Sequence, residues 1–307
     1  MMLRIAFKTT GRPRGVYPGD IMRLPLGYWV AAVVVAMGFP GLAHADEAAN
    51  HYNLGLQLKH QGKNAEAIAE MEKAIQLRSD YAAAYFSLGN LWRAQNEYDK
   101  AAAAFEKSVK LQPKDAASHA NLGSIYVRQK RIDQGIKELE TAVSLKSDDY
   151  ETLVSLGFAY RNKGDYPKAI EFLKKATDLK PTEAMAWTNL GVARARTEDK
   201  EGAIAAFKKA IELKPQDGKA HFNLAATYRR MRKTEEAIKE YELAISYDPS
   251  LAGAHYDVGL LYQQQQRREE ALAAFKKFLS TSGTEDAGAR KDAEERIKTL
   301  ETALNKK

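Results

Sequence analysis

Hydrophobic positions along the chain repeat on two length scales. Over short stretches they follow the helical spacing of three and four residues, as Leu122, Ile125 and Tyr126 do. After a brief interval the same spacing resumes with Ile136 and Leu139. The two stretches together recur every 34 residues over most of the chain. This pattern predicts a series of amphipathic helix pairs, each a helix-turn-helix unit.

The most regular position in the unit is a small residue that recurs seven times without insertion or deletion. It is occupied by Gly55, Gly89, Gly123, Gly157, Gly191, Ala225 and Gly259. An aromatic column lies three residues later, at Leu58, Trp92, Tyr126, Tyr160, Arg194, Tyr228 and Tyr262. A second small column lies twelve residues later, at Ala67, Ala101, Gly135, Ala169, Ala203, Ala237 and Ala271. Small residues let two helix backbones approach, because a larger side chain would force them apart at roughly 1–3 kcal/mol.

This pattern resembles the tetratricopeptide repeat (TPR) family. The family motif is visible as Trp187-x-x-Leu190-Gly191 and in the stretch from Tyr85 to Trp92. The resemblance covers about residues 48–285, in units 48–81, 82–115, 116–149, 150–183, 184–217, 218–251 and 252–285. It implies an all-α fold, a right-handed α-solenoid (superhelix) of seven 34-residue repeats. One unit cannot bury its own apolar face, so the copies must stack side by side.

The ends of the units carry further signals. Acidic residues stand where the second helices are expected to begin, as N-caps, at Asp99, Asp133, Asp165 and Asp199. Proline closes four units, at Pro113, Pro181, Pro215 and Pro249. Beyond Gly283 the repeat stops, and apolar residues at helical spacing predict a capping helix over 286–307. The alternative for this segment is an amphipathic helix that binds a partner.

Two residues depart from the columns. Arg194 stands where an aromatic side chain is expected, and it either pairs with an acidic neighbour such as Glu198 or marks looser packing. Gly135 replaces alanine in the second small column. The sequence does not decide what either departure does.

An uncharged stretch lies near the N-terminus, from Leu24 to Ala43. Its densest apolar part, residues 28–39, is twelve residues long, whereas a membrane span needs roughly 20. Arg23 supplies positive charge before the stretch. These features indicate the hydrophobic region of a signal peptide.

A cleavage motif follows this stretch at Ala43-His44-Ala45. We therefore expect residues 1–45 to be a signal peptide cut before Asp46, with translation starting at Met22, and a periplasmic or secreted mature protein. The alternative is an uncleaved segment that anchors the protein in the inner membrane.

Composition narrows the function. The chain has 307 residues, of which 45% are hydrophobic and 28% charged, a normal soluble composition. The absence of cysteine excludes disulfides, thiolate metal sites and a cysteine nucleophile. Of 47 Lys/Arg and 40 Asp/Glu, five and one lie in residues 1–45, so the rest carry 42 and 39, a net charge of +3. This balance disfavours a nucleic-acid partner.

Candidate chemistry is sparse. The phosphate-loop, dinucleotide, metalloprotease and nucleophile-elbow motifs are all absent from the sequence. Four histidines share one column, at His51, His119, His221 and His255. Neighbouring copies of a column lie roughly 8–10 Å apart, whereas zinc bonds histidine at about 2 Å. We expect these histidines to fill the family's aromatic positions between helices, and we predict no metal, no cofactor and no enzyme activity.

A polar column suggests what the repeats bind. Two residues before the small residue stand Asn53, Ser87, Asn121, Ser155, Asn189, Asn223 and Asp257. In the family the first helix of each unit lines the concave wall, and an amide both donates and accepts, so it matches an extended peptide backbone. The column is similar to the asparagine ladder in the repeat region of O-GlcNAc transferases, interrupted here by Ser87 and Ser155. The alternative is that the amides bridge or cap neighbouring helices.

Neighbouring columns complete the expected groove. One holds Tyr52, Phe86, Ala120, Val154, Thr188, Phe222 and Tyr256, and another holds Leu56, Asn90, Ser124, Phe158, Val192, Ala226 and Leu260. Basic residues near the ends of the first helices are Lys59, Arg93, Arg128, Arg161, Arg196, Arg229 and Arg230. At the groove edge they would favour an acidic segment or a free carboxyl terminus, and the alternative is complementing the helix dipoles.

The candidate peptide-binding residues are Asn53, Asn121, Asn189, Asn223, Tyr52, Phe86, Phe158, Phe222, Tyr256, Arg93, Arg128, Arg161 and Arg229. The sequence thus predicts a non-enzymatic protein–protein interaction scaffold of the bacterial envelope that binds an extended peptide segment of a partner. The alternative is a regulatory subunit that recruits cargo to a separate transferase or protease. We expect no nucleic-acid partner and no stable membrane insertion after cleavage. The partner and the oligomeric state are not specified by the sequence.

Overall fold

A computed structural model describes residues 40–283 and 286–305. Regular structure in these ranges is helical throughout, and the helices form two compact units that divide between Asp80 and Tyr81. None of the helices in this part of the chain is both long and apolar enough to cross a membrane. The expected signal peptide, residues 1–45, lies outside the described residues, apart from the backbone at its end.

The first unit contains one helix pair, α2 (Pro40–His60) and α3 (Asn64–Leu77). The helices cross closely at Gly55, where an added Cβ would lie 2.9 Å from the Met71 side chain and 3.3 Å from the Ala67 carbonyl. His51 Nδ1 lies 2.5 Å from Glu70 Oε2 across the pair. This unit corresponds to the first predicted repeat.

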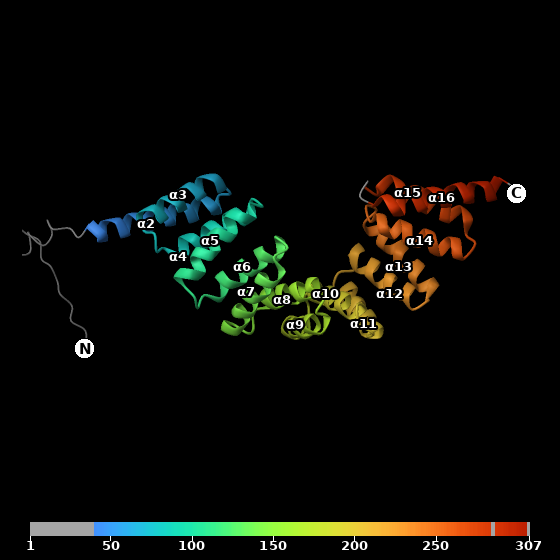
Figure 1. Cartoon of the computed structure of the whole chain (residues 1–307), viewed down its shortest axis with the longest axis horizontal. Helices are drawn as coiled ribbons and strands as arrows, with labels where there is room; N and C mark the ends of the chain where they lie inside the picture. The colour runs from blue at the N-terminus through green and yellow to red at the C-terminus, as the bar shows by residue number, and fades with distance from the viewer. Residues whose placement is uncertain (1–39, 284–285, 306–307) are drawn as a thin grey trace, which may run out of the picture. The chain divides into compact units, whose positions relative to one another are not determined.

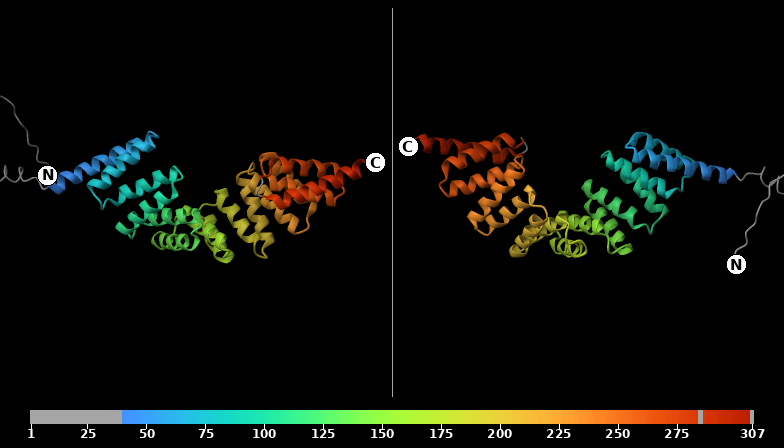
Figure 2. Two further views of the ribbon diagram at one scale, coloured as in Figure 1. Left: turned by 45° about the horizontal axis from the view of Figure 1, so that its top comes forward. Right: turned by 180° about the vertical axis from the view of Figure 1, so that it is seen from behind.

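The second unit contains six further helix pairs and a last helix (Figure 1). The pairs form repeats 2 to 7: α4 (Ala82–Ala94) with α5 (Tyr98–Leu111), α6 (Ala116–Arg128) with α7 (Ile132–Leu145), α8 (Tyr150–Lys163) with α9 (Tyr166–Leu179), α10 (Ala184–Ala195) with α11 (Lys200–Leu213), α12 (Gly218–Arg230) with α13 (Thr234–Tyr247), and α14 (Ala252–Gln264) with α15 (Arg268–Thr281), followed by α16 (Ala287–Asn305). Each pair packs against the next, as two further views also show (Figure 2). The prediction of an all-α array of helix-turn-helix repeats is confirmed.

Glycine sets how closely the two helices of a pair approach. In α8, an added Cβ at Gly157 would lie 2.5 Å from the side chain of Leu173 on α9. In α10, an added Cβ at Gly191 would lie 2.6 Å from Phe207 on α11. Leu173 and Phe207 are almost fully buried, so each glycine provides room for a core side chain of the following helix.

Gly135 provides a second close contact in repeat 3. An added Cβ at Gly135 would lie 2.6 Å from the Val127 side chain and 2.9 Å from the Gly123 carbonyl oxygen. Because Gly123 already faces Leu139, the backbones of α6 and α7 meet at a glycine on each helix. The departure at Gly135 is therefore part of the helix crossing in this repeat.

The histidine column is built into the core. His119 Nδ1 lies 2.7 Å from Glu138 Oε2, and its Nε2 lies 3.1 Å from the Pro113 carbonyl oxygen. His221 repeats both contacts, with Glu240 and Pro215. Each ring thus joins the second helix of its own pair to the turn that closes the preceding pair.

Arg194 pairs with an acidic neighbour, and that neighbour is Asp199, not Glu198. Its Nε lies 3.3 Å from Asp199 Oδ2, and its Nη1 donates to the Gly202 carbonyl oxygen at 3.2 Å. The side chain therefore reaches from α10 to the start of α11, along the turn where an aromatic ring would have packed.

The predicted N-caps are correct in two of four cases. Asp165 and Asp199 precede α9 and α11 and accept from the amides of Lys168 and Gly202. Asp99 and Asp133 are not caps, because α5 and α7 begin one residue earlier and place them in the first helical turn. There Asp99 accepts from Gln129 and Asp133 pairs with Lys163, so both link neighbouring repeats.

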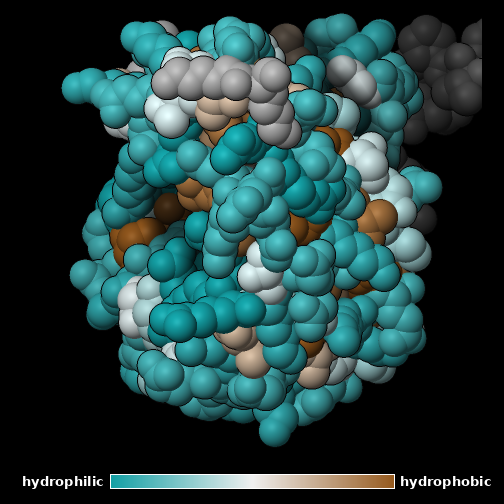
Figure 3. All heavy atoms as spheres, turned by 90° about the vertical axis from the view of Figure 1, so that its right-hand side faces the viewer, coloured by the Kyte–Doolittle hydropathy of each residue, from teal (hydrophilic) through white to brown (hydrophobic). Residues whose placement is uncertain are grey.

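Helix α16 covers the last repeat, as predicted for a capping helix. Its Ala293 and Leu300 are buried in the core cluster that includes Phe275 and Phe278 of α15. Tyr256 of α14 donates to Asp292 Oδ2 at 2.7 Å. The face of the molecule that carries α15 and α16 is mostly hydrophilic, with small hydrophobic patches (Figure 3). The helix thus closes the core and presents polar residues outward.

Replacing Gly135 by alanine should lower the free energy of unfolding by about 1–3 kcal/mol, because the new methyl group has no room beside Val127 and the Gly123 carbonyl. Chemical denaturation of the full chain measures this. Gly288→Ala is the control, since a Cβ there meets nothing within 4 Å. It should leave stability unchanged or raise it by up to about 1 kcal/mol. Equal effects of the two changes would contradict the close-crossing account.

Candidate functional site

Three hollows follow the first helices of repeats 3 to 6 in the second unit. We call them the polar hollow, between α6 and α8, the apolar hollow, across α6, α8 and α10, and the basic hollow, between α10 and α12. Their volumes are about 440, 540 and 350 Å³. The polar and apolar hollows share Ser124, Glu151 and Ser155, so they are continuous. We refer to this side of α6, α8, α10 and α12 as the first-helix surface.

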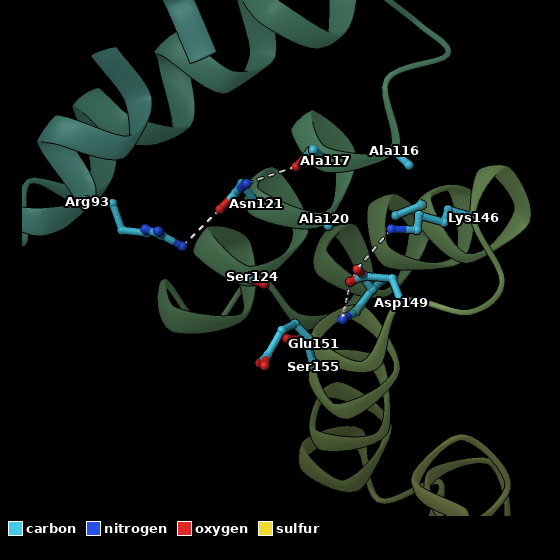
Figure 4. Close-up of a pocket in the computed structure, with 12 residues that line it drawn as sticks. Arg93, Ala116, Ala117, Ala120, Asn121, Ser124, Lys146, Asp149, Glu151 and Ser155 are labelled. Carbon is cyan, nitrogen blue, oxygen red and sulfur yellow. Dashed lines mark hydrogen bonds and ion pairs between the residues drawn. The ribbon is translucent and has the colours of Figure 1, made fainter. Parts of the chain in front are cut away.

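The polar hollow carries charges of both signs (Figure 4). Lys146 lies 3.6 Å from Asp149, which caps α8 by accepting from Thr152. The Thr152 hydroxyl and the Lys146 ammonium lower the pKa of the Asp149 carboxyl, so this cap is ionised at neutral pH. Glu151 also lines the hollow. Balanced charge gives this hollow no preference for a charged ligand of one sign.

The apolar hollow holds the most exposed large apolar side chains of the first-helix surface. Phe158 is 36% exposed and Met185 is 51% exposed, and both line this hollow together with Val127 and Val154. The Arg161 guanidinium lies 4.6 Å from the centroid of the Phe158 ring and holds it from one side. The predicted groove residue Arg128 also lines this hollow. The arrangement suits an apolar side chain of a ligand.

The basic hollow has an apolar wall and a cationic rim. Val192, Phe222 and Ala226 form part of the wall, and Asn223 lies beside them. The two charged residues that line it are Arg196 and Arg230. Both are exposed, so they face solvent at the rim. The lining contains no acidic residue to neutralise them.

Two asparagines of the predicted column bridge neighbouring repeats. Asn121 Oδ1 accepts from Arg93 Nη1 at 2.9 Å, and Asn189 Oδ1 accepts from Arg161 Nη1 at the same distance. Asn121 Nδ2 also donates to the Ala117 carbonyl oxygen (Figure 4). The bridging role that the sequence left open is therefore present at these two positions, and their carbonyl oxygens are occupied.

The last member of the column makes the same link with a carboxylate. Arg229 Nη1 lies 3.3 Å from Asp257 Oδ1, and the buried Tyr241 hydroxyl donates to Asp257 Oδ2 at 2.9 Å. Burial raises the pKa of the Asp257 carboxyl, while Arg229 acts in the opposite direction. Burial and the Asp257 charge raise the pKa of Tyr241, which remains a donor. This group holds repeat 6 to repeat 7.

These links occur at every second joint of the second unit. Arg93, Arg161 and Arg229 lie 68 residues apart, two repeat lengths, and each reaches the residue 28 positions later. The intervening repeats carry Val127 and Ala195 at the equivalent position, and they cannot make the link. The polar and basic hollows lie at these two unlinked joints. Arginine therefore fills one joint and leaves the next open.

The other candidate residues divide into packed and open positions. Phe86, Phe222 and Tyr256 make edge-to-face contacts with Phe105, Tyr241 and Phe275 of the following helices, so much of each ring belongs to the core. Asn223 lines the basic hollow, and its side-chain amide has no hydrogen bond within the described residues. Tyr52 and Asn53 lie on α2 in the first unit, outside the surface described here.

Sequence reasoning missed three features of the surface. Met185 and Glu151 lie at the start of their helices, outside the columns considered, although both line the apolar hollow. The alternation of the arginines was also missed, although it is readable as a 68-residue period. Residues 40–283 and 286–305 contain no group of three His, Asp or Glu side chains placed to hold a metal ion.

Asp257→Ala should lower the free energy of unfolding by about 1–3 kcal/mol, because Arg229 and the Tyr241 hydroxyl lose their buried acceptor. Asp257→Asn should keep most of the stability, since asparagine accepts from arginine at the two equivalent joints. Thermal and urea unfolding of the two variants gives the comparison. An equal loss in both would show that the charge of Asp257, and not its acceptor atoms, matters.

Several known proteins share this architecture. A tetratricopeptide repeat protein from Parabacteroides merdae is 17% identical, covers 83% of this chain and 99% of its own, and superimposes with a TM-score of 0.63. MamA from Desulfovibrio magneticus RS-1 is 25% identical over 55% of this chain and 96% of its own, with a TM-score of 0.53. YrrB, described as a TPR protein with an unusual peptide-binding site, is 21% identical over 64% and 97%, also with a TM-score of 0.53. A comparison with curated protein sequences gives no significant match.

Family models agree with these likenesses. Models described as tetratricopeptide repeat match residues 52–116 and 159–218, 93–156, 206–239 and 252–283, and one described as TPR repeat matches 232–266. Together they span most of residues 52–283. The specific likeness of the asparagine column to that of O-GlcNAc transferases is not shown by these comparisons and stays a hypothesis. The chain belongs to the tetratricopeptide repeat family.

Proposed function

We propose that this protein is a non-enzymatic scaffold that binds an extended segment of a partner protein along its first-helix surface. The apolar hollow is the observation that carries the proposal. Phe158 and Met185 stay exposed there at 36% and 51%, although the repeats bury most of their large apolar side chains. Exposed apolar side chains in a concave site, flanked by polar groups, are typical of a binding surface.

The polar groups of the surface suit a peptide backbone. Asn223 has both its donor and its acceptor free, and Asn189 keeps its Nδ2 donor because only its Oδ1 is engaged within the described residues. Each such contact contributes about 0.5–1.5 kcal/mol, and apolar burial in the hollows adds to it. After the cost of ordering a flexible segment, dissociation constants on the order of micromolar follow. The likeness to YrrB, whose description includes a peptide-binding site, supports the same use of the fold.

The proposed location is the bacterial envelope, after export. It rests on the uncharged stretch from Leu24 to Ala43 and on the motif at Ala43-His44-Ala45. N-terminal sequencing of the exported protein should begin at Asp46. A mature chain that keeps residues 22–45 would contradict cleavage and favour an anchored protein.

Replacing Phe158 and Met185 together by serine should weaken partner binding at least tenfold, because both apolar side chains of the apolar hollow are lost. The partner is first captured from the envelope fraction by cross-linking to the full chain. Its binding segment is then mapped with overlapping peptides, and affinity is measured by fluorescence anisotropy. An activity assay on the captured complex reports whether the chain instead serves a separate enzyme.

A matched control is Leu111→Ser with Leu179→Ser. These leucines are 36% and 42% exposed and end the second helices α5 and α9, outside the three hollows. The control should bind as the parent does. If the control loses affinity and the Phe158/Met185 variant does not, the partner binds elsewhere and the proposal fails.

A further inference from the structure

We propose that the basic hollow recognises an acidic side chain of the bound segment, placed three residues from an apolar side chain that enters the apolar hollow. This inference rests on the proposed function and adds the chemistry of the partner. The occupant is an internal aspartate or glutamate of an extended chain. The residues that select it are Arg196, Arg230 and Asn223.

The basic hollow exists because one arginine is missing. In repeats 2, 4 and 6 the arginine at this register crosses to the asparagine or aspartate of the next repeat. In repeat 5 that register holds Ala195, so Asn223 of repeat 6 has no arginine to pair with. The volume that a guanidinium fills elsewhere stays open between α10 and α12, as a hollow of about 350 Å³.

The cations of this joint lie one residue further along. Arg196 follows Ala195 directly, and Arg230 stands at the same register in repeat 6. Arg230 Nη1 donates to the Ala195 carbonyl oxygen, which fixes the guanidinium at the rim and leaves its other N–H groups available. Arg196 has no ion pair within the described residues. Two guanidiniums therefore face the hollow without a carboxylate.

Positive charge accumulates in this region. The pKa of the Arg161 guanidinium is lowered by burial and then by the charge of Arg196. Because Arg161 is engaged by the neutral Asn189, it is not neutralised by its partner either. An incoming carboxylate would relieve this repulsion and accept charge-assisted hydrogen bonds, which are about twice as strong as neutral ones. The polar hollow offers no such gain, because Lys146 already pairs with Asp149.

The spacing follows from the distance between helices. Neighbouring first helices lie roughly 8–10 Å apart, so adjacent hollows are separated by about one such step. A polyproline II backbone rises about 3.1 Å per residue and brings every third side chain to the same face. Three residues thus cover about 9 Å. A segment with an apolar residue and an acidic residue three positions apart places one in each hollow.

The test uses a positional library of N-acetylated, C-amidated decapeptides, so that neither terminus adds charge, bound to the full chain. We expect the selected peptides to carry Asp or Glu three residues from Leu, Met or Phe. In Arg196→Glu/Arg230→Glu, binding of those peptides should fall at least tenfold, and Lys or Arg should replace the acidic residue in a new selection. The control is Lys208→Glu/Lys239→Glu, which makes the same change in charge at exposed lysines of α11 and α13. It should select as the parent does.

A second variant separates a binding hollow from general attraction. Ala195→Arg restores the missing arginine opposite Asn223 and adds positive charge. If the hollow binds the carboxylate, this variant should weaken the acidic peptides at least tenfold. Tighter binding would show that only long-range charge acts, and it would overturn the inference. It also decides the question if the double charge reversal does not fold.

The outcomes distinguish the two proposals. If the parent protein selects no peptides, both the proposed function and this inference are wrong. If it selects peptides without an acidic position, or if Arg196→Glu/Arg230→Glu leaves the acidic preference unchanged, the inference is wrong and the proposed function stands.

Discussion

The structure depends on close packing between two helices that are each apolar on one side. A single pair leaves apolar side chains uncovered, so each pair of the second unit packs on the next, and α16 covers the last. The small column makes this possible. Gly157 and Gly191 leave room for Leu173 and Phe207, and that fit places the second helix against the first at a fixed register. Every later feature of the surface inherits this 34-residue step.

Interactions between repeats are more varied than those within them. Tyr126 donates to Glu106, and Tyr262 donates to Glu242, each across a joint. The histidines of repeats 3 and 6 connect each pair to the preceding turn. Arginine joins alternate repeats through Asn121, Asn189 and Asp257. The array is thus uniform in its backbone step and alternating in its side-chain links.

The alternation connects the packing to the proposed binding surface. Where arginine crosses a joint, the amide column serves the fold. Where valine or alanine replaces it, at Val127 and Ala195, a hollow remains. The same column therefore has two uses along one surface. A partner that contacts only the open joints meets different chemistry at each, balanced charge at the polar hollow and cations at the basic hollow.

Much of the fold was predictable from the sequence, because the small column repeats seven times and each copy imposes the same helix crossing. Helix starts were less predictable. Asp99 and Asp133 look like caps, but an earlier start places them inside their helices. The site was predicted only in outline. Residue type shows that asparagine and arginine lie near each other, but not that Arg93 and Arg161 occupy the asparagine carbonyls, since that depends on the distance between helices.

Native-state hydrogen exchange on the full chain tests most directly whether each repeat is held by its neighbours. If it is, the free energy of opening should be highest in the central repeats of the second unit and should fall toward α4 and α16. Gly135→Ala should lower protection chiefly in repeat 3 and the repeats beside it. Uniform protection from α4 to α16, with an equal loss everywhere in the variant, would contradict the account.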